Sequence, residues 1–353
     1  MDLPRIGMLP AGELDSIGDV PGVTVGHFTL AQGARQTGVT VVRPHEGDPF
    51  RNKVPAAATV LNGFGKSCGL IQVEELGVLE TPIALTNTFA VGAVANAQIR
   101  QAIAANPEIG RAWPTVNPLV FECNDGYLND IQAQAVAEAH YEQAWRGAAS
   151  VFEQGSVGAG RGMSSFGFKG GIGSASRLAE AYPGQRYTVG ALVLSNFGQR
   201  SSMTIAGRPF GRRLAAAARD GEPAGQPEKG SIILLLATDA PLDSRQLRRL
   251  SLRAGAGLAR TGSVFGHGSG DIALAFSTAY TIPHLAERGM PVQVMLHETR
   301  IDALFEAAAE AVEQAIVAAL WRAETVAGRD GHVRRAIREA APQWRQWLAE
   351  TAF

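Results

Sequence analysis

One serine in this sequence stands where its hydroxyl could become a nucleophile. Ser231 follows Gly230 and precedes an apolar run, residues 232–237, that predicts a buried strand. If the Gly230–Ser231 bond were cut, a free α-amine with a pKa of about 7.7–8.0 would lie beside the hydroxyl and could take its proton. Gly230 also carries no side chain to obstruct attack by the hydroxyl on the preceding carbonyl. Gly-Ser before a strand is usually an ordinary strand entry, so both interpretations stay open.

A second segment with candidate catalytic side chains, residues 122–129, begins at the end of another apolar run. It places Asp125 and Tyr127 near a strand end, where active-site loops often lie on a rigid scaffold. The alternative is an Asn-Asp-Gly turn without a catalytic role. Residues 62–66 also follow a predicted strand and by themselves are typical of a turn.

The third candidate is the segment from Gly266 to Asp271, which enters a predicted strand. Ser269 and Asp271 supply a hydroxyl and a carboxylate two residues apart, which can hydrogen-bond a reacting centre. The alternative is a tight glycine turn. His267 could form a serine–histidine catalytic pair. However, no G-x-S-x-G elbow is present, and the position of His267 at the tip of the turn predicts that it is exposed.

A glycine-rich stretch from Gly155 to Arg177 could bind an anion. Its eight glycines let backbone amides approach a ligand, and Arg161 and Lys169 could meet a phosphate. However, the stretch has no GxxxxGK[ST] motif, and its GxG pair lacks the acidic partner of a dinucleotide-binding unit. A loop that bends tightly beside a pocket is the simpler interpretation.

Strands and helices predicted from the apolar pattern must position these segments. Their irregular alternation favours a layered fold with helices covering sheets over a regular parallel βαβ winding. Asp243 and Ser244 can cap a helix, and the polar stretch 209–230 predicts an exposed, mobile loop. Besides 232–237, the predicted strands are 22–27, 39–42, 57–61, 83–85, 119–122, 188–195 and 272–276; the predicted helices are 91–105, 131–152, 244–259, 302–324 and 332–350.

Composition sets the broad class. The 353 residues are 46% apolar and include 41 glycines, against a usual glycine share of about 7%. The 32 basic and 33 acidic residues, with a net charge of -1, offer no footprint for nucleic acid. Two cysteines, Cys68 and Cys123, exclude a disulfide scaffold, and seven scattered histidines show no metal-ligand spacing. With no signal pattern and no apolar run of membrane-spanning length, we expect a soluble, cytoplasmic protein without membrane or metal partners.

Several longer motifs occur in one order along almost the whole chain. They include DVPGVTVGH (19–27), NGFGK (62–66), NDGY (124–127), GFKGGIG (167–173), LSNF (194–197), GSII (230–233), ATDAPL (237–242) and GSGD (268–271). Through these motifs the sequence resembles the L-aminopeptidase/D-amino-acid amidase-esterase family, which includes the β-peptidyl aminopeptidases.

The resemblance implies a self-processing hydrolase. Family members cut themselves at a Gly–Ser bond, which here is Gly230–Ser231, so we expect one domain processed into residues 1–230 and 231–353. The implied fold is a four-layer αββα sandwich, similar to N-terminal-nucleophile hydrolases but with different strand connectivity. The implied activity is release of N-terminal residues from short peptides, amides or esters through an acyl-enzyme on Ser231, without a cofactor.

Roles for the other candidate residues also follow from the resemblance. Asn196 would donate to the oxyanion, and Tyr127 would assist at the tetrahedral centre. Ser269 and Asp271 would orient the new amine and hydroxyl, and Asp125 would lie where the free amine of the substrate binds. The processed units would form a homo-oligomer.

This sequence departs from the family pattern at two positions, and two other functions remain as alternatives. Asp271 stands where glutamate is expected, and His267 where asparagine is usual. An acyltransferase related to the ornithine acetyltransferases would also cleave itself, although the usual nucleophile there is threonine and not a serine such as Ser231. A phosphate-ligand binding protein would use the loop from Gly155 to Gly173.

Overall fold

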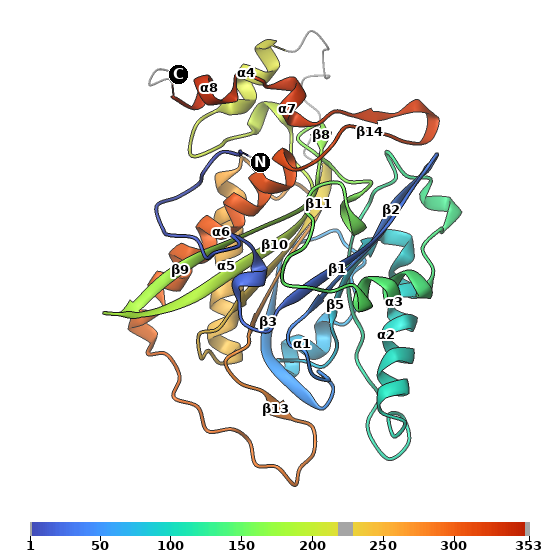
Figure 1. Cartoon of the computed structure of the whole chain (residues 1–353), viewed down its shortest axis with the longest axis vertical. Helices are drawn as coiled ribbons and strands as arrows, with labels where there is room; N and C mark the ends of the chain where they lie inside the picture. Colours follow the sequence, from blue (N-terminus) through green and yellow to red (C-terminus); the bar gives the residue numbers. More distant parts are fainter. Residues whose placement is uncertain (1, 218–228, 350–353) are drawn as a thin grey trace.

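Two stacked β-sheets form the centre of the molecule (Figure 1). The structure, a computed structural model, describes residues 2–217 and 229–349. The larger sheet contains β3 (Asn52–Gly63), β4 (Val78–Leu79), β9 (Gly171–Tyr182), β10 (Gln185–Asn196), β11 (Lys229–Thr238), β12 (Gly268–Ser277) and β13 (Ile282–Pro283); the smaller contains β1 (Thr24–Gln32), β2 (Arg35–Arg43), β5 (Ile83–Asn87) and β6 (Leu119–Cys123). The strand orders are β13-β3-β12-β11-β10-β9, with β4 also paired to β3, and β1-β2-β5-β6.

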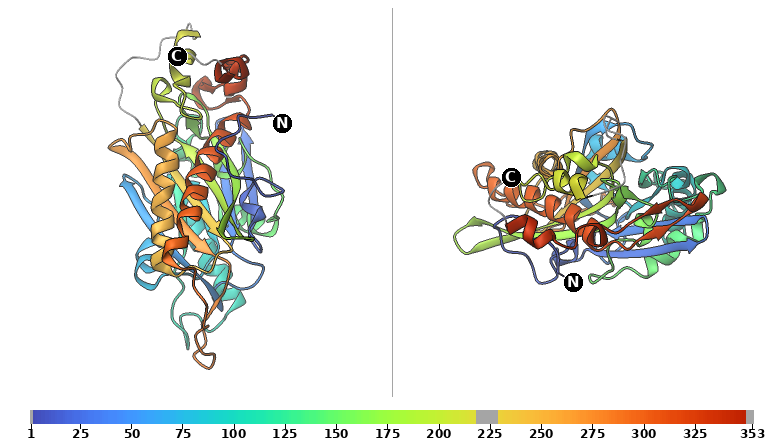
Figure 2. Two further views of the ribbon diagram at one scale, coloured as in Figure 1. Left: turned by 90° about the vertical axis from the view of Figure 1, so that its left-hand side faces the viewer. Right: turned by 90° about the horizontal axis from the view of Figure 1, so that it is seen from above.

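Helices cover the outer face of each sheet (Figures 1 and 2). The helices are α1 (Leu70–Leu76), α2 (Val91–Ala105), α3 (Glu138–Arg146), α4 (Phe210–Ala217), α5 (Ser244–Arg260), α6 (Asp302–Trp321), α7 (Ile337–Ala340) and α8 (Trp344–Ala349). The pair α2 and α3 lies on the smaller sheet, and the pair α5 and α6 lies on the larger one. This arrangement confirms the expected αββα layers. Within the described residues, no helix combines the length and apolar character needed to cross a membrane.

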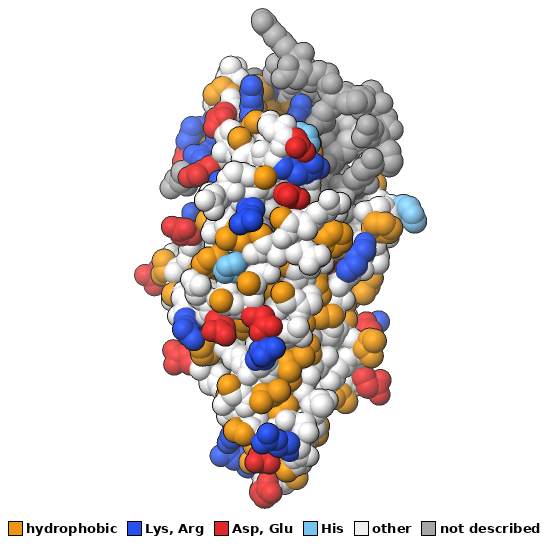
Figure 3. All heavy atoms as spheres, turned by 90° about the vertical axis from the view of Figure 1, so that its right-hand side faces the viewer, with side chains coloured by type: hydrophobic (Ala, Val, Ile, Leu, Met, Phe, Trp, Pro, Cys, Tyr) orange, Lys and Arg blue, Asp and Glu red, His pale blue; other side chains and the backbone are white. Residues whose placement is uncertain are grey.

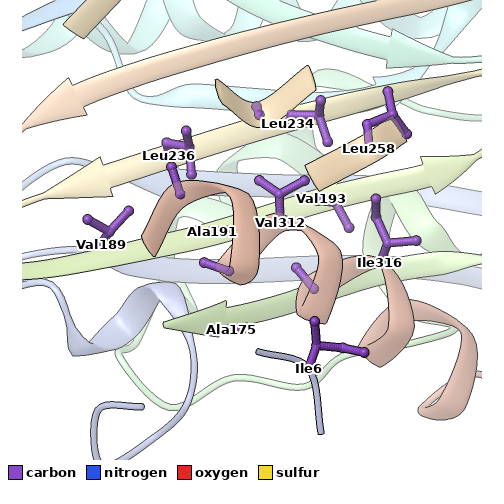
Figure 4. Close-up of a cluster of buried hydrophobic side chains, with 14 of the residues drawn as sticks. Ile6, Ala175, Val189, Ala191, Val193, Leu234, Leu236, Leu258, Val312 and Ile316 are labelled. Carbon is purple, nitrogen blue, oxygen red and sulfur yellow. The ribbon is translucent and has the colours of Figure 1, made fainter. Parts of the chain in front are cut away.

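The apolar run after Ser231 forms the central strand β11, which is buried on both faces. Leu234 and Leu236 point toward the α5–α6 layer, as Figure 4 shows. Ile233 and Leu235 point the other way, into the core between the two sheets. A strand covered on both faces reads as a continuous apolar run instead of an alternating one, which explains why this strand could be predicted from sequence.

Helix α5 begins where the sequence predicts. Asp243 is its N-cap: the Asp243 carboxylate accepts the Gln246 N–H at 2.7 Å, and the Gln246 side chain accepts the Asp243 N–H at 3.2 Å. The two residues therefore form a reciprocal capping box, which satisfies amide groups that a first helical turn leaves unpaired.

The glycine-rich stretch is only in part a loop, which corrects the sequence-based interpretation. Its second half forms β9, which packs against α6. A Cβ at Gly173 would lie 1.9 Å from the carbonyl oxygen of Ala315 in α6, so a side chain there would force the helix away from the sheet. The glycines and serines of β9 thus allow close helix packing, but they hide the apolar pattern by which strands are recognised.

Three other predicted elements differ from the structure. The expected helix 131–152 is the 3-10 turn Ile131–Ala133 followed by α3, which ends at Arg146 with Gly147 as its C-cap. The expected helix 332–350 contains the strand β15 (Val333–Arg334), which pairs with β14 (Val326–Ala327), and then α7 and α8. The expected loop 209–230 begins with α4 and ends within β11; residues 218–228 lie outside the described part of the chain.

Candidate active site

Three neighbouring strands bring most of the predicted catalytic residues together. Strand β11 lies between β10 and β12, and Ser231 pairs in register with Asn196 on β10 and with Gly270 on β12. Ser269 and Asp271 flank Gly270 along β12. The Ser231 hydroxyl, the Asn196 amide and the Ser269–Asp271 pair come from three separate segments of the sequence, and they meet at one end of the larger sheet.

Hydrogen bonds link the members of this group. The Gly270 N–H donates to Ser231 Oγ at 3.1 Å, and Ser269 Oγ donates to Asp271 Oδ1 at 2.5 Å. Ser231 is 6% exposed and Asp271 is fully buried. A serine hydroxyl held by a backbone amide, next to a buried hydroxyl–carboxylate pair, has the parts needed for proton transfer and acyl chemistry.

The structure gives Gly230 a stricter role than the sequence suggested. Its φ is +122°, a conformation that only glycine adopts without strain. A Cβ at this position would lie 2.0 Å from the carbonyl oxygen of Asn196. A side chain is therefore excluded by the neighbouring strand as well as by the backbone conformation, directly at the bond expected to be cut.

Asn196 is held in one orientation by both atoms of its amide. Its Oδ1 accepts the Ser164 N–H at 2.8 Å, and its Nδ2 donates to the carbonyl of Asn124 at 3.0 Å. The Nδ2 group has two protons, so one remains for a substrate oxygen. This side chain is only 6% exposed, and it lines the same cavity as Ser231. The geometry suits a fixed hydrogen-bond donor toward a developing negative charge.

A buried lysine holds the segment around Ser164 in place through hydrogen bonds. Lys169 is fully buried, and its ammonium donates to the carbonyls of Gly160, Met163 and Gly170 at 2.8, 2.9 and 2.8 Å. Burial lowers the pKa of this ammonium well below its usual value. Because these three bonds use all its protons, Lys169 cannot meet a phosphate, which removes one support for the anion-binding interpretation. It instead holds the loop that orients Asn196.

A cavity of about 620 Å³ opens beside Ser231. Tyr127, 39% exposed, stands at its wall: its ring stacks on His332 with centroids 4.5 Å apart, and the Arg334 guanidinium lies 3.7 Å from its ring centroid. His267 is exposed at the turn before β12, as expected. The cavity is lined by Phe64, Lys66, Thr88, Phe89, Glu122, Asn124, Tyr127, Ser164, Asn196, Gly230, Ser231, Gly268 and Arg334.

Asp125, expected at the substrate amine, is not among the residues that line this cavity. Its carboxylate is 1% exposed and accepts a hydrogen bond from Asn129 Nδ2 at 3.0 Å. Burial raises its pKa to about 7, although hydrogen bonds from Thr37 and Asn129 and the charge of Lys169 act in the opposite direction. The side chain belongs to the packed interior.

Among the described residues, the carboxylate that lines the cavity is Glu122, for which the sequence alone suggested no role. Glu122 Oε1 accepts the Lys66 N–H at 2.7 Å, and Oε2 accepts the Thr88 hydroxyl. The side chain is 3% exposed. One signal was present in the sequence: an acidic residue inside an otherwise apolar strand must find partners, because an unpaired buried carboxylate is costly.

The raised pKa of Asp125 predicts how stability changes with pH. A carboxyl group with a higher pKa in the folded state binds its proton more tightly there than in the unfolded chain. Its contribution to the free energy of unfolding is therefore fully present below about pH 4 and is lost as the pH rises through about 7. Three pKa units correspond to roughly 4 kcal/mol. Asp125→Asn removes this titration. In denaturant unfolding, we expect the free energy of unfolding of the variant to rise by up to that amount relative to wild type between about pH 4 and pH 7.5. If the free energy of unfolding changed in the same way with pH in both proteins, the raised pKa of Asp125 would be refuted.

Known proteins share both the sequence and the architecture of this chain. Residues 15–334 match peptidase family S58. The beta-peptidyl aminopeptidase BapA of Sphingosinicella microcystinivorans is 40% identical over 344 residues, covering 91% of this chain and 85% of that protein. The structure of a beta-aminopeptidase from Burkholderia sp. has 41% identity and a TM-score of 0.89, covering 99% of this chain and 97% of that one. The L-aminopeptidase D-Ala-esterase/amidase of Ochrobactrum anthropi has 36% identity and a TM-score of 0.87, covering 98% of each chain; it is described as a prototype of the serine aminopeptidases and a new variant of the Ntn hydrolase fold.

Proposed function

The chain belongs to peptidase family S58 and is a serine aminopeptidase and amidase, and we propose that its nucleophile is the Ser231 hydroxyl, freed when the chain cuts its own Gly230–Ser231 bond. Cutting there divides the domain into residues 1–230 and 231–353. The observation that carries the proposal is the strand register that sets Ser231 between Asn196 and Gly270 at the cavity. The family assignment gives no support to the acyltransferase or to the phosphate-binding alternative.

Self-cleavage is proposed to begin with attack by Ser231 Oγ on the carbonyl carbon of Gly230. The hydroxyl proton leaves, the C–N bond breaks, and the departing nitrogen of Ser231 takes up a proton, so an ester replaces the amide. Water then hydrolyses the ester, leaving a carboxylate on Gly230 and a free amine on Ser231. Ser269 and Asp271, on either side of Gly270, are the neighbouring groups that can relay these protons.

The mature enzyme then uses the new amine as its base. The neutral α-amine of Ser231 takes the hydroxyl proton while Oγ attacks the carbonyl of the substrate, and Asn196 Nδ2 donates to the oxyanion. Tyr127 stands at the cavity wall, where its hydroxyl would assist at the tetrahedral centre. The leaving amine carries the proton away, and water hydrolyses the acyl-enzyme. Short peptides, amides and esters are the proposed substrates.

Recognition of the free amine of the substrate is assigned to Glu122 in place of Asp125. An aminopeptidase must bind a cationic N-terminus near the scissile carbonyl, and Glu122 is the carboxylate that lines the cavity among the described residues. Its two oxygens already accept the Lys66 N–H and the Thr88 hydroxyl, which fix the carboxylate in place. Each carboxylate oxygen has a further lone pair for an ammonium group.

We expect Glu122→Gln to lose its preference for free amines. A hydrogen bond to a charged group contributes about 1.5–3 kcal/mol, so kcat/KM for a free-amine peptide should fall roughly 10- to 100-fold, mainly through KM. The ratio of kcat/KM for this peptide to kcat/KM for its N-acetyl form should fall by the same factor. Glu74→Gln, at an exposed glutamate of α1, is the matched control. An unchanged ratio in Glu122→Gln would exclude the assignment.

We also propose an oligomeric state and a cellular location for the enzyme. The resemblance implies assembly of processed units into a homo-oligomer, and the sequence predicts a cytoplasmic location without nucleic-acid or membrane partners. Size-exclusion chromatography of the processed protein tests the first of these.

A further inference from the structure

A small hairpin near the end of the chain borders the catalytic cavity. Strands β14 and β15 form it as a separate two-stranded sheet, with the turn Arg329–Gly331 between them. Figure 1 shows it in red at the upper right. Figure 3 looks onto the side toward which it projects, where charged side chains of both signs are spread across the surface. Arg334, at the end of β15, lines the cavity beside Ser231.

This hairpin is hydrogen-bonded to three successive carbonyl groups of the loop that carries Tyr127. The Arg329 side chain donates from Nε to the Gly126 carbonyl at 2.7 Å, and the Arg329 N–H donates to the Leu128 carbonyl at 2.8 Å. Between them, His332 Nδ1 donates to the Tyr127 carbonyl at 2.8 Å. The backbone on both sides of Tyr127 is therefore tied to one element, which lies about 200 residues further along the chain.

The hairpin also contacts the ring of Tyr127. The His332 ring stacks on it with 9° between the two planes, and the Arg334 guanidinium lies 3.7 Å from its centroid. A guanidinium over an aromatic face is attracted by the negative charge of that face. Tyr127 is 39% exposed, so burial alone does not hold its ring. The two hairpin side chains fix the direction in which the Tyr127 hydroxyl points.

Arg334 links Tyr127 to the proposed oxyanion donor as well. Its Nε donates to Ser164 Oγ at 3.2 Å, and the Ser164 N–H donates to Asn196 Oδ1 at 2.8 Å. One guanidinium thus contacts Tyr127 directly and Asn196 through a single intervening residue. These are the two groups assigned to the tetrahedral centre, and their relative placement depends on Arg334.

We propose that His332 and Arg334 are positioning residues that hold the Tyr127 hydroxyl at the tetrahedral centre formed on Ser231. This inference rests on the proposed function, because it assigns the hairpin to a step of that chemistry. After the proposed cut, the hairpin belongs to residues 231–353 and the Tyr127 loop to residues 1–230, so both fragments set the geometry. Precise placement matters because a shift of about 1 Å in a catalytic group can lower the rate on the order of 10²-fold.

A double-mutant cycle on kcat tests the proposal, with rates scaled to the fraction of cut protein. Arg334→Gln and His332→Ala should each lower kcat for a p-nitroanilide about tenfold, with less than about a twofold change in KM. Tyr127→Phe keeps the ring and removes only the hydroxyl, and it should lower kcat at least as much. In the Tyr127→Phe background, each hairpin substitution should cost less than about threefold, because no hydroxyl is left to misplace.

Two variants of neighbouring charge serve as controls. Arg335→Gln removes the same charge at the next residue, whose side chain is exposed, and should leave kcat unchanged. Arg334→Lys keeps a cation beside the ring and should recover most of the lost rate. Circular dichroism shows which variants are folded. Should His332→Ala fail to fold, His332→Phe, which keeps the stacking and loses the Nδ1 donor, takes its place.

Three results would overturn the proposal. Losses of equal size with and without the Tyr127 hydroxyl would mean that the hairpin acts on another group. A higher KM with unchanged kcat in Arg334→Gln would place this side chain on the substrate instead. Full activity of Tyr127→Phe would remove the role of the hydroxyl itself, but it would leave the Ser231 nucleophile in place if Ser231→Ala were inactive and uncut.

Discussion

Ser231→Ala is expected to remain a single uncut chain with no measurable peptide hydrolysis. The hydroxyl is needed twice in the proposed chemistry, first to attack the Gly230 carbonyl and then to attack the substrate. Its removal leaves the surrounding hydrogen bonds almost intact, since the Gly270 N–H to Ser231 Oγ is the one side-chain bond described for this serine. We therefore expect a folded protein that is inactive and unprocessed, which an intact-mass measurement and circular dichroism would establish.

Two further variants distinguish the role of the Ser231 hydroxyl in cleavage from that of the backbone around it. Ser231→Thr keeps a hydroxyl in the same place and should still be cut, although more slowly because of the added methyl group. Gly230→Ala keeps the nucleophile but sets a Cβ 2.0 Å from the Asn196 carbonyl, so it should impair cutting through distortion of the strand. If Ser231→Ala were cut or active, another residue would have to be the nucleophile.

Asn196→Ala is expected to lower kcat by about 10²–10³-fold in protein that has been processed, the usual effect of removing one oxyanion donor. Because the tetrahedral centre of self-cleavage forms at the same serine, cutting should slow as well. Kinetics with a p-nitroanilide substrate, scaled to the fraction of cut protein, measure the first effect. KM should change little, because the donor acts mainly in the transition state.

Asn196→Asp is the matched variant for this test. An aspartate keeps an oxygen to accept the Ser164 N–H, which Asn196 Oδ1 accepts at 2.8 Å, but it loses the Nδ2 donor and adds a negative charge. We expect it to be at least as impaired as alanine. Circular dichroism must first show that it is folded, because its second carboxylate oxygen would face the Asn124 carbonyl, to which Asn196 Nδ2 donates at 3.0 Å. Activity close to wild type in Asn196→Asp would show that the donor does not stabilise the oxyanion.

The elements with an undisturbed apolar pattern could be predicted from sequence. The helix predicted at 91–105 is α2 (Val91–Ala105), and the run 232–237 lies within β11 because both faces of that strand are covered. Strand β9 was missed because Gly173 and its neighbours are small for the sake of close packing with α6. Local pattern carries no information on α6, which packs on β9 but lies far along the chain from it.

The candidate site, too, could be predicted from the sequence only in part. Ser231, Ser269 and Asp271 could be singled out by residue type, and the resemblance added Asn196, but only the strand register explains why they meet. The choice between Asp125 and Glu122 could not be made from sequence, since both follow or end the same strand. Our proposal of Glu122 rests on side-chain direction: Glu122 lines the cavity, and Asp125 is buried against Asn129.

Cleavage at Gly230–Ser231 can be tested by N-terminal sequencing of the smaller fragment, from freshly purified protein separated under denaturing conditions. We expect two chains, with Ser231 as the first residue of the smaller one and Gly230 as the last residue of the larger. A preparation that hydrolyses peptides at full rate while the Gly230–Ser231 amide is still intact would contradict this expectation.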